Sequence, residues 1–194
     1  MLLSIVTKDK TLTQPIQREL LGVDYELIND SWVNGLKIAE GKFVCFLEEG
    51  SDFRGGFFIR GMLNMLANPN FRKLAVVAPA VEDFNGRGTL YQLDITGDRA
   101  WDEMRSINPY PVQVGYIPGA IIRTSALKQL NPEKELKNYT TPADLSAAIC
   151  LKLWETGQMV HVDPRITYLT DITTLTDAHQ PSQEVEAIWK RQSI

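Results

Sequence analysis

The first 81 residues alternate between short apolar runs and segments whose apolar residues recur at helical spacing. Apolar runs that favour strands occupy residues 1–8, 23–30, 42–48 and 74–80, and helical patterns lie between them at 11–20, 31–41 and about 55–67. Such alternation is typical of a largely parallel sheet with helices on both faces, which binds ligands at the carboxyl ends of its strands. We therefore expect an α/β fold.

The alternation breaks after residue 81. Residues 82–111 mix Gly-rich turns with a possible strand at 89–96 and a short amphipathic helix, which indicates an irregular insertion. A strand is expected at about 112–122, followed by a helix that Thr124 or Ser125 can cap.

The clearest helical signal begins at "TTPADLSAAICLKLWETG". Thr141 suits the N-cap, Pro142 the first helical position, Asp144 the first turn and Gly157 the stop. A strand within 158–169 and a final helix at 182–192 complete the expected order.

Length and composition fit one domain without disulfide support. The chain has 194 residues, of which 44% are hydrophobic, and its two cysteines, Cys45 and Cys150, lack metal-ligand spacing and lie in apolar segments. Neither a signal peptide nor an apolar run of about 18 residues is evident, so we expect a soluble, cytoplasmic protein. A net charge of −4 argues against a broad electrostatic grip on nucleic acid, although a local basic patch is compatible with it.

Three stretches, in order, resemble the GT-A fold glycosyltransferases of family 2. They are "WVNGLKIAEGKFVCFLEEGSDF", "YIPGAIIRTSALKQL" and "TTPADLSAAICLKLWETGQMVHVDP". The resemblance covers most of the chain, weakly at each point, and implies a single GT-A-like domain over 1–194. Residues 1–81 would form its nucleotide-binding half and 82–194 its acceptor side.

In that family, an acidic cluster after the third strand holds Mg²⁺ or Mn²⁺ against the donor diphosphate, because hard cations prefer carboxylate oxygens. The resemblance implies Glu48, Glu49 and Asp52 as metal ligands here, with Gly50 at the place of one ligand. Asp171, close to where many family members have a histidine, can supply a further oxygen. The alternative is an ordinary polar loop.

The nucleotide is expected to bind at the ends of the first two strands. By resemblance, Thr7 and Lys8 lie where the family binds the base, and Asp30 contacts the nucleoside. Alternatively, Lys8 is a solvated charge, Asn29 and Asp30 merely turn the chain, and either Asp30 or Ser31 caps the next helix. Arg60, Arg123 and Arg165 are candidates for binding a diphosphate, since a planar guanidinium binds phosphate in a fork.

Asp144 is the candidate catalytic residue. In inverting members of the family, the acid at this helix start removes the proton of the acceptor hydroxyl as its oxygen attacks the anomeric carbon, a role that needs hydrogen-bonding reach. A first-turn Asp also complements the helix dipole, and the family's preceding Glu is here Ala143.

The sequence thus predicts a glycosyltransferase that moves a sugar from a nucleotide diphosphate donor to a hydroxyl acceptor, with inversion and with Mg²⁺ or Mn²⁺. Two alternatives stay open: a nucleotidyltransferase-like enzyme, or a degenerate GT-A domain that binds a partner. The acceptor class is not readable from the sequence, and a nucleic-acid acceptor is possible but not indicated. Trp101 and Tyr110 can stack on a sugar or base, or pack, and His161 is expected to pack within its strand.

Overall fold

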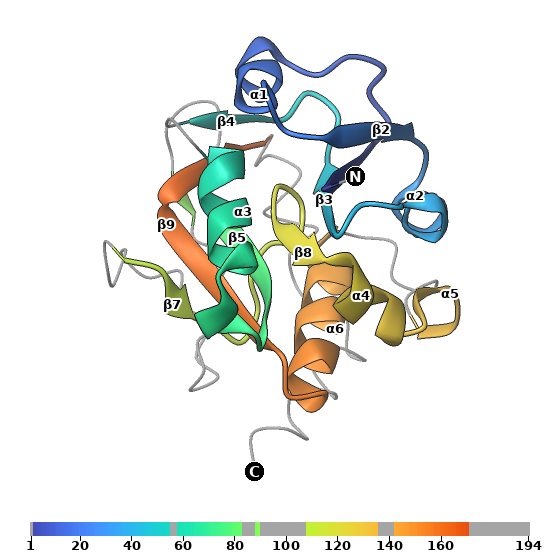
Figure 1. Cartoon of the computed structure of the whole chain (residues 1–194), viewed down its shortest axis with the longest axis vertical. Coiled ribbons are helices and arrows are strands. Elements are labelled where there is room, and N and C mark those ends of the chain that lie inside the picture. Colours follow the sequence, from blue (N-terminus) through green and yellow to red (C-terminus); the bar gives the residue numbers. More distant parts are fainter. Residues whose placement is uncertain (1, 55–57, 83–87, 90–107, 136–141, 171–194) are drawn as a thin grey trace.

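The computed structural model describes residues 2–54, 58–82, 88–89, 108–135 and 142–170 (Figure 1). Its helices are α1 (Gln14–Glu19), α2 (Trp32–Ile38), α3 (Phe58–Ala67), the 3₁₀ turn η1 (Pro69–Phe71), α4 (Thr124–Gln129), α5 (Pro132–Glu135) and α6 (Pro142–Glu155). Its strands are β1 (Leu3–Thr7), β2 (Tyr25–Asn29), β3 (Phe43–Leu47), β4 (Asp52–Arg54), β5 (Leu74–Glu82), β6 (Gly88–Thr89), β7 (Tyr110–Pro111), β8 (Ile121–Arg123) and β9 (Met159–Leu169).

The strands of the described residues form one nine-stranded sheet with the order β2-β1-β3-β8-β5-β9-β4, in which β6 pairs with β5 and β7 with β9. β2 and β3 are both parallel to β1, and β9 is parallel to β5. β8 is antiparallel to both β3 and β5, so β1, β2, β3, β5 and β9 run in one direction. The prediction of a mostly parallel α/β sheet is confirmed.

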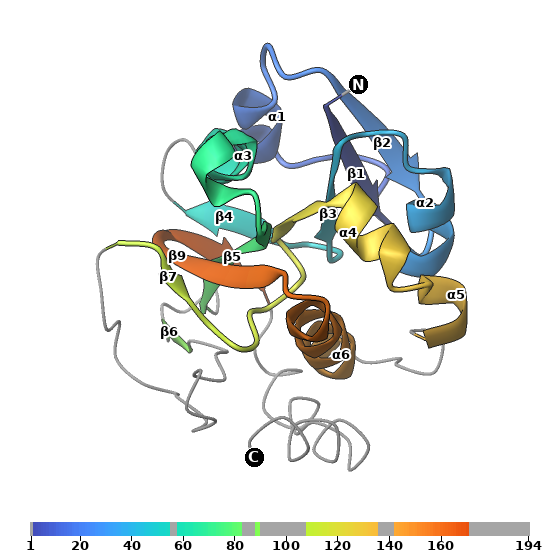
Figure 2. The ribbon, with the colours of Figure 1, turned by 60° about the horizontal axis from the view of Figure 1, so that its bottom comes forward.

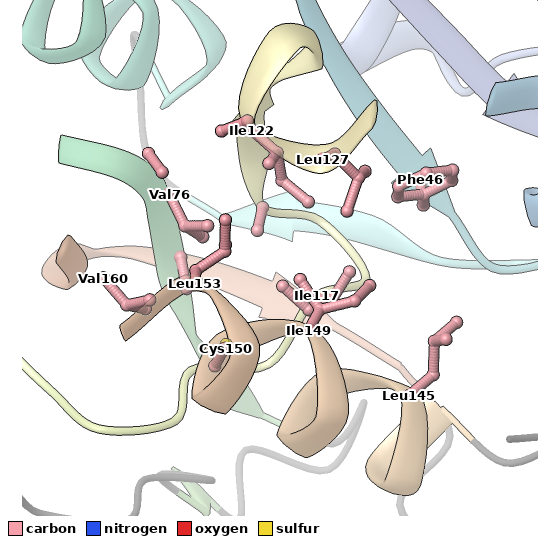
Figure 3. Packing of buried hydrophobic residues seen from close by; sticks show 14 of the residues in the cluster. Phe46, Val76, Ile117, Ile122, Leu127, Leu145, Ile149, Cys150, Leu153 and Val160 are labelled. Carbon is pink, nitrogen blue, oxygen red and sulfur yellow. The ribbon is translucent and has the colours of Figure 1, made fainter. Parts of the chain in front are cut away.

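Each face of the sheet is covered by its own hydrophobic cluster. Buried residues of α1 and α3 pack on one face, and those of α2, α4 and α6 pack on the other. Figure 2 shows α3 and α6 on opposite sides of β5 and β9. In Figure 3, Leu145, Ile149 and Leu153 extend from the side of α6 that faces the sheet, and all three are at most 7% exposed. Burying such side chains on both faces stabilises the sheet.

Local sequence signals determine both ends of α6. The helix begins at Pro142, as expected, while the proposed cap Thr141 lies outside the described residues. At the other end Gly157 has a φ of 75°, its N–H donates to the Trp154 carbonyl, and the Gln158 N–H donates to that of Leu153. This is a Schellman termination, so the predicted stop at Gly157 is confirmed.

The segment 112–122 differs from the single strand that its apolar pattern predicts. The chain leaves β7 at Pro111 and enters β8 at Ile121, and between them an isolated bridge joins Pro118 to Phe46. Proline lacks a backbone N–H and Gly119 has a φ of 76°, so neither residue suits a regular ladder. These residues are nevertheless buried, which explains why they read as a strand.

The start of α4 differs from the prediction. The N-cap of α4 is Arg123 and no side chain caps the helix, so the predicted cap by Thr124 or Ser125 is wrong.

Three predicted features lie outside the described residues. They are the strand 89–96 except for Thr89, the final helix 182–192 and Trp101.

Cys45 and Cys150 are both free and buried, as expected, and burial raises the pKa of each thiol to about 12. Within the described part of the chain, every helix is too short or too polar to cross a bilayer.

Candidate functional site

The carboxyl ends of β1, β2 and β3 meet at one edge of the sheet. Thr7, the last residue of β1, is in register with Asn29 of β2 and with Leu47 of β3. The residues that follow these strands therefore leave the sheet at the same level. In parallel α/β sheets this edge is where ligands bind.

Glu48, the first residue after β3, is held by hydroxyl groups from two distant parts of the chain. The Tyr116 hydroxyl lies 3.1 Å from Oε1 and 3.0 Å from Oε2, and the Thr170 hydroxyl donates to Oε2 at 3.1 Å. The backbone N–H of Glu48 donates to the hydroxyl of Tyr168 at 3.0 Å. Glu48 thus ties the end of β3 to the end of β9 and to the segment before β8.

Burial dominates the electrostatics of this cluster. It raises the pKa of Glu48 above its ordinary value, and the hydrogen bonds from Tyr116, Thr170 and Tyr168 oppose that rise. Burial also raises the pKa of Tyr168, with the nearby Glu48 charge acting in the same direction. Ionisable groups with shifted pKa values cluster at functional sites, so Glu48 is a candidate site residue.

The remaining acidic residues of the turn after β3 have separate partners. Asp52 lies in β4, and its Oδ1 accepts from the Thr13 hydroxyl at 3.0 Å and from the Phe53 N–H at 2.8 Å. Glu49 is exposed, and Asp171 lies outside the described residues.

The carboxylates that the structure describes form no group of metal ligands. Among the residues that the structure describes, no three His, Cys, Asp or Glu side chains are grouped so as to hold a metal ion. A hard cation needs several oxygen ligands at 2.0–2.6 Å, roughly, with lone pairs directed at it.

Asp9 joins the loop after β1 to the turn after β3. Its N–H donates to the hydroxyl of Thr7 at 3.0 Å, and its Oδ2 accepts from the N–H of Gly50 at 3.0 Å. Gly50 has a φ of 69°, which glycine adopts readily. Thr7 is buried and Lys8 is exposed. Because Asp9 bonds both to Thr7 and to Gly50, these two predicted nucleotide-binding residues lie beside the acidic turn.

Asp30 lies at the start of α2, where its Oδ1 accepts from the Ser31 N–H at 2.6 Å and from the Asn34 side chain at 3.3 Å. Ser31 is the N-cap and accepts from the Asn34 N–H at 3.4 Å, which confirms the predicted cap. Within the described residues, Oδ2 of Asp30 accepts no hydrogen bond. One oxygen therefore anchors the helix start, and the other can accept a bond from a ligand.

Asp144 lies half-buried in the first turn of α6. Two residues later, the Ser146 hydroxyl donates to the Pro142 carbonyl at 2.6 Å and accepts from the Ile117 N–H at 3.0 Å. Ile117 follows Tyr116, whose hydroxyl contacts Glu48. A short chain of contacts thus links the start of α6 to the Glu48 cluster.

The three arginines considered for a diphosphate are occupied elsewhere. Arg60 donates to the Glu19 and Leu21 carbonyls, and Arg123 donates to those of Leu74, Leu66 and Phe71. Arg165 pairs with the buried Asp163, its Nη2 at 2.6 Å from Oδ2. Each guanidinium therefore stabilises the fold in this structure.

Sequence reasoning missed Asp9, Tyr116 and Tyr168. Both tyrosines are at most 1% exposed, and a buried phenol needs a hydrogen-bond partner. Their apolar surroundings in the sequence were a signal of burial. Nothing local to either tyrosine pointed to Glu48, which lies 68 residues from Tyr116 and 120 from Tyr168.

No model of a known protein family matches the sequence, and no curated protein matches it. Among solved structures, the chain is similar to GalNAc-T7 with UDP, GalNAc and Mn²⁺, at a TM-score of 0.52 and 8% identity, over 88% of this chain and 44% of that one. It is also similar to Staphylococcus aureus TarS, at a TM-score of 0.51 and 12% identity, over 97% of this chain and 42% of that one.

Both solved structures are GT-A glycosyltransferases. At such low identity the likeness shows the fold, and the fold of this chain is GT-A-like, as the sequence predicts. The chain spans less than half the length of either structure.

Proposed function

We propose that this chain is a glycosyltransferase that moves a sugar from a nucleotide diphosphate donor to a hydroxyl acceptor with inversion. The observation that carries the proposal is the edge that β1, β2 and β3 share. At this edge Thr7 ends β1, Asp30 follows β2 and Glu48 follows β3, and the three parallel strands are in register. GalNAc-T7, which has the same type of fold, was solved with UDP, and this supports a nucleotide sugar as donor.

The nucleoside would bind between the ends of β1 and β2. Thr7 and Lys8 lie at the end of β1, and the Oδ2 oxygen of Asp30 can accept a bond from a ribose or base group. Residues 1–81 would then bind the donor, and residues 82–194 would shape the acceptor side. The sequence predicts Mg²⁺ or Mn²⁺ at this site, and among the described residues no three side chains are grouped to hold it.

Asp144 would act as the general base. Its carboxylate would take the proton of the acceptor hydroxyl while the acceptor oxygen forms a bond to the anomeric carbon. The bond from that carbon to the diphosphate oxygen breaks on the opposite face, and its electron pair leaves with the nucleoside diphosphate. Attack from the face opposite the leaving group inverts the anomeric configuration.

A second candidate is a GT-A domain that binds a nucleotide or a partner without catalysis. Two departures from the family pattern favour it: Gly50 in the place of an acidic ligand, and Ala143 in the place of a glutamate.

Binding of a nucleoside diphosphate panel, measured by calorimetry on the full chain, tests the proposal. We expect one nucleotide to bind in preference to the others and Asp30→Ala to weaken it. Absence of binding across the panel would contradict a nucleotide-dependent transferase. Binding with no sugar release or transfer from any nucleotide sugar would favour the second candidate.

A further inference from the structure

The lone pairs of the Glu48 carboxylate are directed at hydroxyl groups. Oε1 faces the Tyr116 hydroxyl at 3.1 Å, and Oε2 faces the hydroxyls of Tyr116 at 3.0 Å and Thr170 at 3.1 Å. An ionised carboxylate has about four lone-pair positions, and the two hydroxyls occupy part of that capacity. The two hydroxyls therefore hold the Glu48 carboxylate in one orientation.

The backbone of Glu48 is fixed as well. Its N–H donates to the Tyr168 hydroxyl at 3.0 Å, and its carbonyl accepts from the Ser51 hydroxyl at 2.7 Å. Tyr116 and Tyr168 are at most 1% exposed, so neither phenol can move without opening the core. Glu48 is therefore not poised to swing toward a ligand.

Each neighbouring aspartate is anchored through one oxygen, and no three carboxylates of the described residues are grouped so as to hold a metal ion. Asp52 binds the Thr13 hydroxyl and the Phe53 N–H through Oδ1, and Asp9 binds the Gly50 N–H through Oδ2. Glu49 is exposed, and a lone exposed carboxylate makes a weak cation site.

Two lysines supply positive charge beside the same turn. Lys8 and Lys10 flank Asp9, whose carboxylate is anchored to Gly50 at 3.0 Å. Both lysines are exposed, and across the described residues neither ammonium has an ion-pair partner. Lysine binds phosphate as a point charge and can compensate a diphosphate in place of a metal.

We propose that Glu48 is a positioning residue, not a metal ligand, and that the site binds the diphosphate of its donor without a divalent cation, with Lys8 and Lys10 supplying the charge. Glu48 would act through Tyr116 and Thr170, which it holds at the donor edge. This inference rests on the proposed function and assigns the charge chemistry of that same site.

The first arm of the test compares nucleotide binding with EDTA and with Mn²⁺. The probes are UDP, GDP, ADP, CDP and dTDP, titrated into the full chain by calorimetry, and the EPR signal of free Mn²⁺ is followed in parallel. We expect the preferred nucleotide to bind with affinities that agree within about threefold under the two conditions, and the protein to leave the free Mn²⁺ signal unchanged.

The second arm uses matched variants. Glu48→Gln keeps an oxygen that can accept from Tyr116 and Thr170, so binding should stay within about threefold of wild type, whereas Glu48→Ala should lose about tenfold or more. Lys8→Gln with Lys10→Gln should weaken binding by about tenfold or more. Lys42→Gln, which removes the same charge at the amino end of β3, should change it by less than about twofold.

Each outcome decides one claim. Binding that tightens tenfold or more with Mn²⁺, or Glu48→Gln as damaging as Glu48→Ala, overturns the inference and leaves the proposed function standing. If no nucleotide binds in EDTA and none binds in Mn²⁺, the proposed function is overturned, and the inference is overturned with it.

Discussion

The hydroxyl of Tyr116 lies within 3.1 Å of both carboxylate oxygens of Glu48, although 68 residues separate them in the chain. The contact joins the end of β3 to the segment that leads into β8 and so fixes the edge at which a donor would bind. Its strength is open to measurement, because the phenol of Tyr116 is buried and the hydroxyl can be removed without changing the ring.

Tyr116→Phe should lower the free energy of unfolding by about 1–3 kcal/mol, since it removes a hydrogen bond to a charged, partly buried acceptor. Urea denaturation followed by circular dichroism measures the change. Tyr25→Phe is the matched control, because Tyr25 is 41% exposed on the edge strand β2, and it should change stability by less than about 0.5 kcal/mol. Equal effects of the two substitutions would mean that the Tyr116 bond contributes nothing.

Gly119→Ala should be far more damaging than Gly22→Ala. Both glycines have a φ of 76°, so alanine is strained at either position, by about 1–2 kcal/mol. At Gly119, however, a Cβ would lie 2.5 Å from the Tyr168 ring, whereas at Gly22 nothing lies within 4 Å. We expect Gly119→Ala to cost at least about 3 kcal/mol by the same denaturation assay. A loss no greater than that of Gly22→Ala would show that the ring has room to move.

His161 should make the protein acid-sensitive. It is 8% exposed, both ring nitrogens are without a partner in the described part of the chain, and burial lowers its pKa below 6.5. The unfolded chain therefore binds a proton at higher pH than the folded chain does, so stability falls as pH drops below 6.5 through the lowered pKa. Denaturation over a pH series should show this loss in wild type and a smaller one in His161→Met. Parallel curves for the two proteins would exclude His161 as the cause.

The sequence predicted correctly those helix ends that depend on hydrogen bonds between residues close together in the chain. Ser31 caps α2, and Gly157 ends α6, through bonds to residues no more than five positions away. The parallel arrangement of β1, β2 and β3 followed from the alternation of apolar runs with helical patterns. That arrangement brings Thr7, Asp30 and Glu48 to one edge of the sheet.

The surroundings of Asp52 and Glu48 depend on contacts with residues far away in the chain, and the sequence did not predict these contacts. Asp52, read as a metal ligand in a loop, belongs to β4, which pairs with β9 more than a hundred residues later. The hydroxyl groups that donate to the Glu48 carboxylate lie 68 and 122 residues away. The acidic neighbours of Glu48 in the sequence suggested a cation, whereas the structure places these hydroxyl groups against its carboxylate. The metal assignment of Glu48, Glu49, Asp52 and Asp171 stays a prediction, with Asp171 outside the described residues.

Substitution of Asp144 tests the proposed glycosyl transfer most directly. The full chain is incubated with mixed nucleotide sugars and with glycan, lipid, protein and DNA acceptors, and the products are analysed by mass spectrometry for wild type and Asp144→Asn. We expect a glycosyl mass increment on one acceptor class with release of an equal amount of nucleoside diphosphate, and loss of both in Asp144→Asn, whose amide cannot take the proton. Full turnover in Asp144→Asn would contradict the proposed base, and no transfer or nucleoside diphosphate release in wild type would contradict the transferase itself.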